Sequence, residues 1–179
     1  MVVHPFDYDP GGAVPFLDAS WLSHDGQWFL KTKDRFGLEA AMELNEAAVR
    51  ALGKIEMRRL LKLTGLAEIN DCGGLARMLA TFWAIRGVPA DRAVYRHVSP
   101  DRLEMGLRSC LIWEMARAAG MEGMGIGTLP GCRGFRARMQ GWSEALSREY
   151  EFFVAEERPG DPAAGLVCEH VVVRRKKGS

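Results

Sequence analysis

Cysteines are the side chains in this sequence with the greatest scope for chemistry, and they are spread along the chain without a Cys-x-x-Cys pair. They are Cys72, Cys110, Cys132 and Cys168. Such irregular spacing does not favour a zinc ribbon. Cys132 opens a predicted helix over 133–147, and the exposed amides of a helix N-terminus acidify a thiol. Arg133, Arg136 and Arg138 add positive charge nearby. Cys132 is therefore a candidate nucleophile, and a small buried apolar residue is the alternative interpretation.

A second candidate site lies on the last predicted strand, residues 166–175. Because side chains alternate along a strand, Cys168 and His170 share one face. A cysteine and a histidine two residues apart can form a nucleophile–base pair or ligate a metal ion. With Cys110 and Cys132 they would make a thiolate-rich set that suits a soft transition metal. The cofactor stays unknown at this point, and a thiolate-bound metal is one option. A cysteine that simply packs in the sheet is the other.

Asp25 is the polar anomaly of the first predicted helix, which covers about 18–35. Successive helical residues step by about 100°, so Trp21 and Trp28 fall nearly on one line, with Leu22 and Phe29 to one side. Asp25 falls between these two groups, and His24 lies at the rim. A carboxylate buried among such rings must be paired, shifted in pKa or directed into a cavity. We expect Asp25 to line a pocket with a raised pKa. A structural hydrogen bond, or a rotated helix that exposes Asp25, would also explain it.

The second predicted helix, residues 38–63, repeats this anomaly. Asn45 and Glu56 fall inside its apolar stripe, and Arg59 lies at the edge of the stripe. Glu56 and Arg59 are three residues apart and can pair. The sequence predicts that polar groups of both helices face one shared pocket. A buried ion pair that locks the helices together is the alternative.

The remaining pattern predicts an α+β fold with N-terminal helices packed on a small antiparallel sheet. A third helix is expected over 74–86, followed by a hairpin of strands over 93–98 and 102–108. A short helix over 111–120, a glycine-rich loop over 121–131, the helix over 133–147 and strands over 149–157 and 166–175 complete a β-β-α-α-β-β half. One domain is expected over 1–179. Its parts are an irregular leader over 1–16, a helical part over 17–88, a mixed part over 92–175 and a tail over 176–179.

Composition limits the classes of partner. The 179 residues carry a formal net charge of +1, from 24 basic and 23 acidic side chains, which disfavours nucleic-acid binding by bulk charge. No apolar run approaches the roughly 18 residues of a membrane span, and the N-terminus does not resemble a signal peptide. We therefore expect a cytoplasmic protein with reduced thiols that binds a small molecule and neither nucleic acid nor membrane. A homodimer is compatible with the sequence but not required by it.

Residues 20–65 resemble a bacterial and archaeal family of unknown function, related to the L-2-amino-thiazoline-4-carboxylic acid hydrolase-like proteins. The recurrent pattern is His-Asp-Gly-x-Trp-Phe, a Phe-Gly break, Glu-Leu and Ile-Glu-x-Arg-Arg. Here it reads His24, Asp25, Gly26, Trp28, Phe29, Phe36, Gly37, Glu43, Leu44, Ile55, Glu56, Arg58 and Arg59. Cys110, Cys132 and Cys168 occupy places similar to those of the family's cysteines. The resemblance implies helices on an antiparallel sheet, and the family name implies ring opening of a small sulfur heterocycle.

Two classes of function follow. The first is a thiol-dependent hydrolase of a small C–N or C–S substrate, with Cys132 as nucleophile and His24 or Asp25 as base or orienting group. Arg59 would bind a substrate carboxylate, and Trp21 and Trp28 would line the pocket. The second is a non-catalytic sensor or carrier that binds a ligand or metal through Cys110, Cys132, Cys168 and His170.

Overall fold

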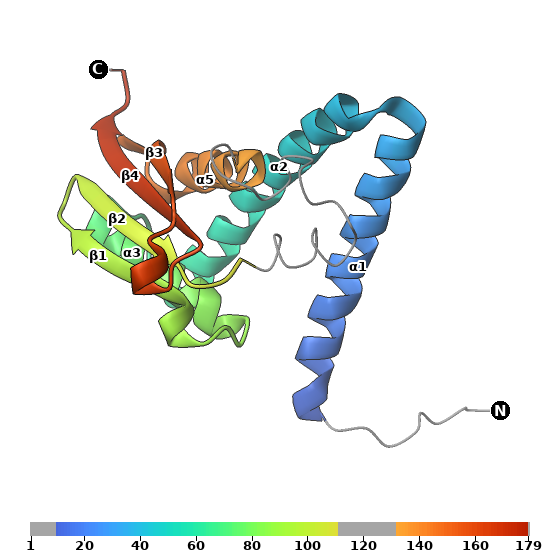
Figure 1. The fold of residues 1–179 in the computed structure, drawn as a ribbon. Coiled ribbons are helices and arrows are strands. Elements are labelled where there is room, and N and C mark those ends of the chain that lie inside the picture. The colour runs from blue at the N-terminus through green and yellow to red at the C-terminus, as the bar shows by residue number, and fades with distance from the viewer. Residues whose placement is uncertain (1–9, 111–131, 179) are drawn as a thin grey trace.

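A computed structural model describes residues 10–110 and 132–178 (Figure 1). The short helix predicted over 111–120 and the glycine-rich loop over 121–131 lie outside these residues. The elements come in the order α1 (Pro10–Phe36), α2 (Leu38–Thr64), α3 (Cys72–Ile85), β1 (Ala93–Val98), β2 (Arg102–Leu107), α5 (Arg133–Leu146), β3 (Tyr150–Pro159) and β4 (Cys168–Lys176). Short 3-10 turns, Ala90–Arg92 and Pro162–Ala164, precede β1 and β4.

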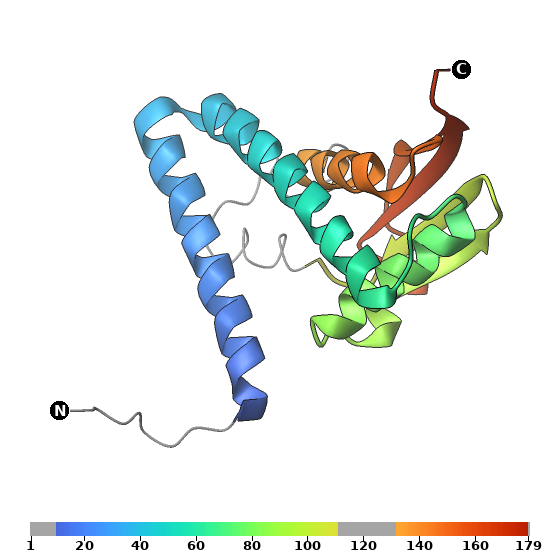
Figure 2. The same cartoon turned by 180° about the vertical axis from the view of Figure 1, so that it is seen from behind.

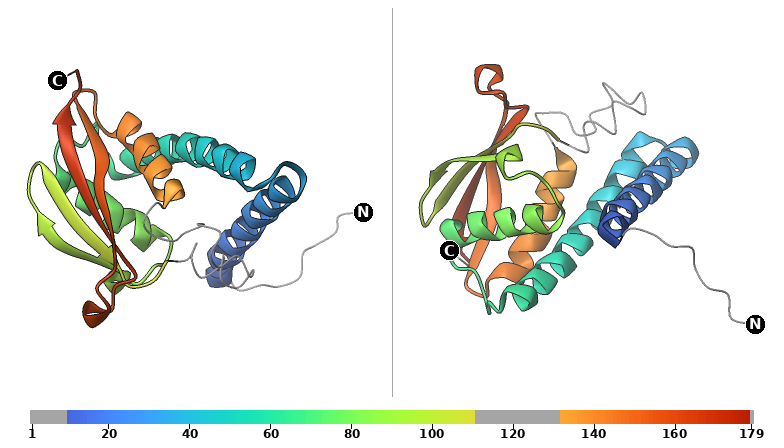
Figure 3. Two further views of the ribbon diagram at one scale, coloured as in Figure 1. Left: turned by 45° about the horizontal axis from the view of Figure 1, so that its top comes forward. Right: turned by 90° about the horizontal axis from the view of Figure 1, so that it is seen from below.

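The four strands form one antiparallel sheet in the order β1-β2-β4-β3. Figure 3 shows α3 and α5 on one face of this sheet, with α2 behind α5. The opposite face carries no helix among the described elements. The predicted α+β architecture, with helices first and strands later, is confirmed.

Local sequence explains most helix ends. Gly37 has a φ of +87° between α1 and α2, and Gly65 has a φ of +70° at the end of α2. Both values lie in the region that favours glycine. The Asp71 carboxylate caps α3 by accepting a hydrogen bond from the Gly74 amide at 2.6 Å. This helix begins two residues before the predicted start at 74, and its first residue, Cys72, is fully buried.

The N-terminal prediction needs a correction. Helix α1 begins at Pro10, so part of the leader expected over 1–16 is helical. Figure 2 shows α1 and α2 as two long helices that lie at an angle to each other. Gly37 is the single residue between them. Helix α1 lies away from the sheet.

One hydrophobic core joins α2, α3, α5 and the inner face of the sheet. Its largest fully buried side chains include Trp142, Phe152, Met57, Leu79 and Leu103. Helices α2 and α5 approach each other closely at two glycines. A Cβ at Gly53 would lie 2.7 Å from the Arg138 carbonyl oxygen, and one at Gly141 would overlap the backbone of Arg50. Glycine at this crossing therefore allows α2 and α5 to pack with their backbones close together.

Neither α1 nor any other helix within residues 10–110 and 132–178 combines the length and apolar content that a membrane crossing demands.

Candidate functional site

The pocket predicted around Asp25 does not have the buried surroundings that were expected. Asp25 and His24 are 53% and 59% exposed, with 3.7 Å between Oδ1 and Nδ1. Trp21 and Trp28 are 55% and 66% exposed. These residues lie on α1, whose less exposed side carries Leu22, Phe29 and the buried Thr32 instead. A helical wheel shows which residues share a face, but it does not show which face packs.

The polar residues of α2 also differ from the prediction. Arg59 is exposed and does not pair with Glu56. Glu56 instead accepts from Arg138 at 3.3 Å and from the Trp142 indole N–H at 3.2 Å, both on α5. Burial lowers the pKa of Arg138, while the charges of Glu56 and Asp25 act in the opposite direction. Glu56 therefore joins α2 to α5, which matches the structural alternative of a buried ion pair with a different arginine.

Asn45 lies beside the first turn of α5. Its Nδ2 atom would be 4.0 Å from a Cβ placed on Gly134. It is half-buried and makes no contact with Glu56, so the two α2 residues do not share a pocket within the described part of the chain.

Side chains with nucleophilic or basic groups do converge at the N-terminal end of α5, where it faces the sheet. Cys168 and His170 lie on the inner face of β4, as strand alternation predicted, opposite Leu107 and Met105 of β2. Cys132 is at the N-terminus of α5, and Cys110 follows β2. The charge of Cys110 helps to raise the pKa of Cys132 and of Cys168, and the charge of Cys132 helps to raise that of Cys168, so the three cysteines lie in one region of the fold.

Glu157 completes this cluster and was missed by the sequence analysis. It is paired with His170 in the β3–β4 register, and its carboxylate is only 1% exposed. Strict alternation from the buried Phe152 would turn Glu157 outward. A β-bulge between Val154 and Glu156 shifts the register and turns Glu157 inward. The bulge has no obvious mark in the sequence, so no signal identified Glu157 beforehand.

His170 and Glu157 form an incomplete pair. His170 Nδ1 lies 3.6 Å from Glu157 Oε1, which is an ion-pair distance and too long for a hydrogen bond. Both atoms are buried without a hydrogen-bond partner in the described part of the chain. The other carboxylate oxygen, Oε2, accepts from Arg136 at 3.0 Å. Arg136 therefore holds the Glu157 carboxylate at one oxygen and leaves the other facing the imidazole.

Burial dominates the protonation of the cluster. It lowers the pKa of His170 to about 4, and the charge of Arg136 acts in the same direction. It raises the pKa of Cys132 to about 11 and that of Cys168 to about 12. The backbone N–H of Phe135 and the Arg136 guanidinium oppose the shift at Cys132. At neutral pH the cluster thus holds neutral thiols and a neutral imidazole.

The helix also positions the imidazole. The ring of Phe135, one turn after Cys132, lies against the His170 ring with centroids 4.3 Å apart. Cys132 and His170 are therefore held by one helix turn and one strand that contact each other. This is the arrangement in which a thiol and a base can cooperate.

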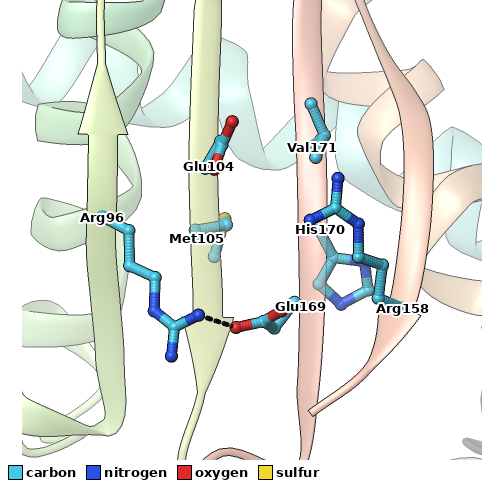
Figure 4. Close-up of a pocket in the computed structure, with 7 residues that line it drawn as sticks. All are labelled: Arg96, Glu104, Met105, Arg158, Glu169, His170 and Val171. Atoms are coloured by element: carbon cyan, nitrogen blue, oxygen red, sulfur yellow. Dashed lines mark hydrogen bonds and ion pairs between the residues drawn. The ribbon is translucent and has the colours of Figure 1, made fainter. Parts of the chain in front are cut away.

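The outer face of the sheet carries charged side chains behind this cluster. In Figure 4, Arg96 of β1 reaches across β2 to Glu169 of β4. Arg158 and Glu156 pair on β3 at 2.6 Å. A small hollow among these residues also touches His170 from the outer side. These charges are already paired, so we assign the chemistry to the inner face.

No preformed metal site is present within residues 10–110 and 132–178. No group of three or more histidine, cysteine, aspartate or glutamate side chains is arranged there to hold a metal ion. The four cysteines are free thiols.

The architecture defines an α+β protein in which a cysteine-capped helix lies against an antiparallel sheet. The chain belongs to a family of unknown function, DUF6125, whose model matches residues 15–122. Cys132, Glu157, Cys168 and His170 lie outside the matched residues. No curated protein and no solved structure matches the chain significantly.

Proposed function

We propose that this protein is a thiol-dependent enzyme that cleaves a C–N or C–S bond of a small molecule. Cys132 is the nucleophile, His170 the general base and Glu157 the group that orients the imidazole. The placement of Cys132 on the helix turn that contacts His170, with Glu157 paired to His170 across the strands, is the observation that carries the proposal. His170 replaces His24 and Asp25 in the role of base, because those two are exposed on the distant α1.

The chemistry can be written with both partners neutral at the start. His170 Nε2 accepts the proton of the Cys132 thiol as Sγ attacks the electrophilic carbon. The C–N or C–S bond breaks, and the leaving amine or thiolate takes that proton from His170. Water then attacks the Cys132-bound intermediate and gives a proton to His170. Release of the product returns this proton to Sγ and restores the thiol.

A raised thiol pKa is compatible with this sequence of steps. A thiol with a pKa of about 11 is protonated at neutral pH and is a poor nucleophile alone. It needs a neutral base at the moment of attack, and His170 is neutral above pH 5 because its pKa is about 4. We also propose that the chain is related to the L-2-amino-thiazoline-4-carboxylic acid hydrolase-like proteins. This relation suggests thiazolines as the first substrates to test.

The test is a mass-spectrometric screen with small thioesters, amides and 2-thiazolines. The wild type should form a transient adduct on Cys132 and release product. Cys132→Ala should abolish both while leaving the circular dichroism spectrum unchanged. Cys168→Ala is the matched control, because it removes a neighbouring buried thiol and should retain turnover. Product release by Cys132→Ala at the wild-type rate would refute the nucleophile.

A second candidate, a soft-metal sensor or carrier, is favoured by the mutual proximity of Cys110, Cys132 and Cys168. Metal binding would deprotonate these thiols and would require them to move closer together. Elemental analysis and native mass spectrometry on protein purified without chelator would test it. Stoichiometric metal, lost when two of the cysteines are replaced by serine, would favour the carrier over the enzyme.

A further inference from the structure

A groove between α2 and α5 leads to the arginine that restrains the Glu157 carboxylate. It measures about 440 Å³, within the usual range for a small-molecule site. Arg50, Arg133 and Arg136 line it together with Glu43 and Glu46. The Arg136 side chain is 53% exposed, whereas the Glu157 carboxylate that it binds is 1% exposed. A ligand in the groove can therefore reach Arg136 without reaching Glu157.

Arg136 holds the Glu157 carboxylate in a position where it faces His170 but does not form a hydrogen bond with it. Arg136 donates through Nε and through a terminal nitrogen to the same oxygen, Oε2, at 3.0 Å in each case. Oε1 and His170 Nδ1 face each other at 3.6 Å, each without a hydrogen-bond partner among the described residues. A small movement of the carboxylate would close this gap to a hydrogen bond.

We propose that a small monocarboxylate bound in the α2–α5 groove takes the Arg136 guanidinium from Glu157, and that Glu157 then hydrogen-bonds His170 and strengthens it as a base. The inference rests on the proposed function and names the class of ligand that activates that site. A carboxylate replaces a carboxylate on Arg136, so the planar fork of the guanidinium is satisfied in both states. The other two arginines of the groove, Arg50 and Arg133, are already paired with Glu144 and Glu46, so a ligand with a single carboxylate matches the one guanidinium that it takes.

The resting enzyme then has a weak base, and ligand binding activates it. Glu157 on β3, Arg136 and Cys132 on α5 and Cys168 on β4 are the titratable groups that surround His170, with Cys110 beyond β2. Of these, Glu157 is the group whose free oxygen faces Nδ1, at 3.6 Å, and it would accept from Nδ1 once the two atoms move closer. A histidine that donates one ring N–H to a carboxylate becomes more basic at the other nitrogen.

The test follows the titration of His170 by NMR on histidine-labelled protein, with trifluoroacetate as the probe. Trifluoroacetate stays ionised throughout, and chloride at equal ionic strength is the reference. In the wild type it should raise the His170 midpoint by about one unit or more, as expected for a carboxylate within hydrogen-bond reach. Arg136→Gln should raise the midpoint without any probe.

Two variants supply the controls. Glu157→Gln should keep the low His170 midpoint and abolish the response to trifluoroacetate. Lys54→Gln is the matched cation variant outside the groove lining. Lys54 pairs with Glu144 at 3.0 Å, so this variant should respond as the wild type does. An unchanged midpoint in the wild type with saturating probe, or a response that persists in Glu157→Gln, would overturn the inference.

The readout does not depend on catalysis, so the two proposals fail separately. A His170 shift in a protein whose Cys132→Ala variant retains turnover would sink the nucleophile and leave the anion switch standing. Loss of turnover in Cys132→Ala, with no shift of the His170 midpoint in the wild type, would support the nucleophile and overturn the anion switch.

Discussion

Acid should destabilise this protein through His170 while the pH is still above the range where most carboxylates titrate. The His170 side chain is 2% exposed, and its pKa is about 4 against an ordinary value of 6.5. The unfolded chain therefore binds a proton at a higher pH than the folded protein does. Stability from this group is complete above about pH 6.5 and is lost as the pH falls toward 4.

The magnitude follows from these two pKa values. Proton linkage predicts a loss of about 2 kcal/mol between pH 7 and pH 5, and about 3 kcal/mol by pH 4. A loss of this size is a large part of the stability of a typical domain. Because the imidazole is almost completely buried, solvent screening should reduce it little.

Urea unfolding at pH 7, 6 and 5, followed by circular dichroism, measures this dependence. His170→Gln should flatten the curve across this range, whatever its effect on stability at pH 7. His97→Gln is the matched control, because His97 is an exposed histidine on β1 and should leave the wild-type slope intact. If His170→Gln lost as much stability between pH 7 and pH 5 as the wild type, the idea of a buried neutral imidazole would be wrong.

Three further predictions concern the fold and the thiols. In thermal denaturation, Gly141→Ala should lower the free energy of unfolding by about 1–3 kcal/mol, because the added Cβ would overlap the α2 backbone. Gly134→Ala is the control, and it should be neutral or stabilising because the space beside Gly134 is open. Trp28→Ala should change the free energy of unfolding by no more than about 0.5 kcal/mol because the Trp28 ring is exposed. Trp142→Ala should lower it by about 3–5 kcal/mol because the Trp142 ring is buried in the core. Equal losses for the two variants in urea titrations would contradict the assigned core. Cys132 should react with iodoacetamide slowly at pH 7 and faster as the pH rises toward its pKa of about 11, and peptide mapping that found rapid labelling at pH 7 would show an acidic thiol instead.

The sequence by itself determined the fold class and most of the helices and strands that the structure describes. Apolar periodicity and the glycines at 37 and 65 placed α2 to within one residue, and the turn at 99–101 placed the β1–β2 hairpin. Strand alternation put Cys168 and His170 on one face because the period of a strand is two wherever no bulge intervenes. These are local properties, and the local chain encodes them.

Tertiary structure alone decided where the site lies. Asp25 shares a helical face with two tryptophans, but whether that face is buried depends on how α1 meets the rest of the chain, and it is exposed. Glu56 could have paired with Arg59 by spacing, yet it bonds to Arg138 and Trp142 of α5. Glu157 faces the cluster because a bulge reversed its side of the strand, and Arg136 binds it from α5, a different element of the fold. Contacts between residues far apart in the chain depend on how all the elements are arranged, which periodicity and spacing do not specify.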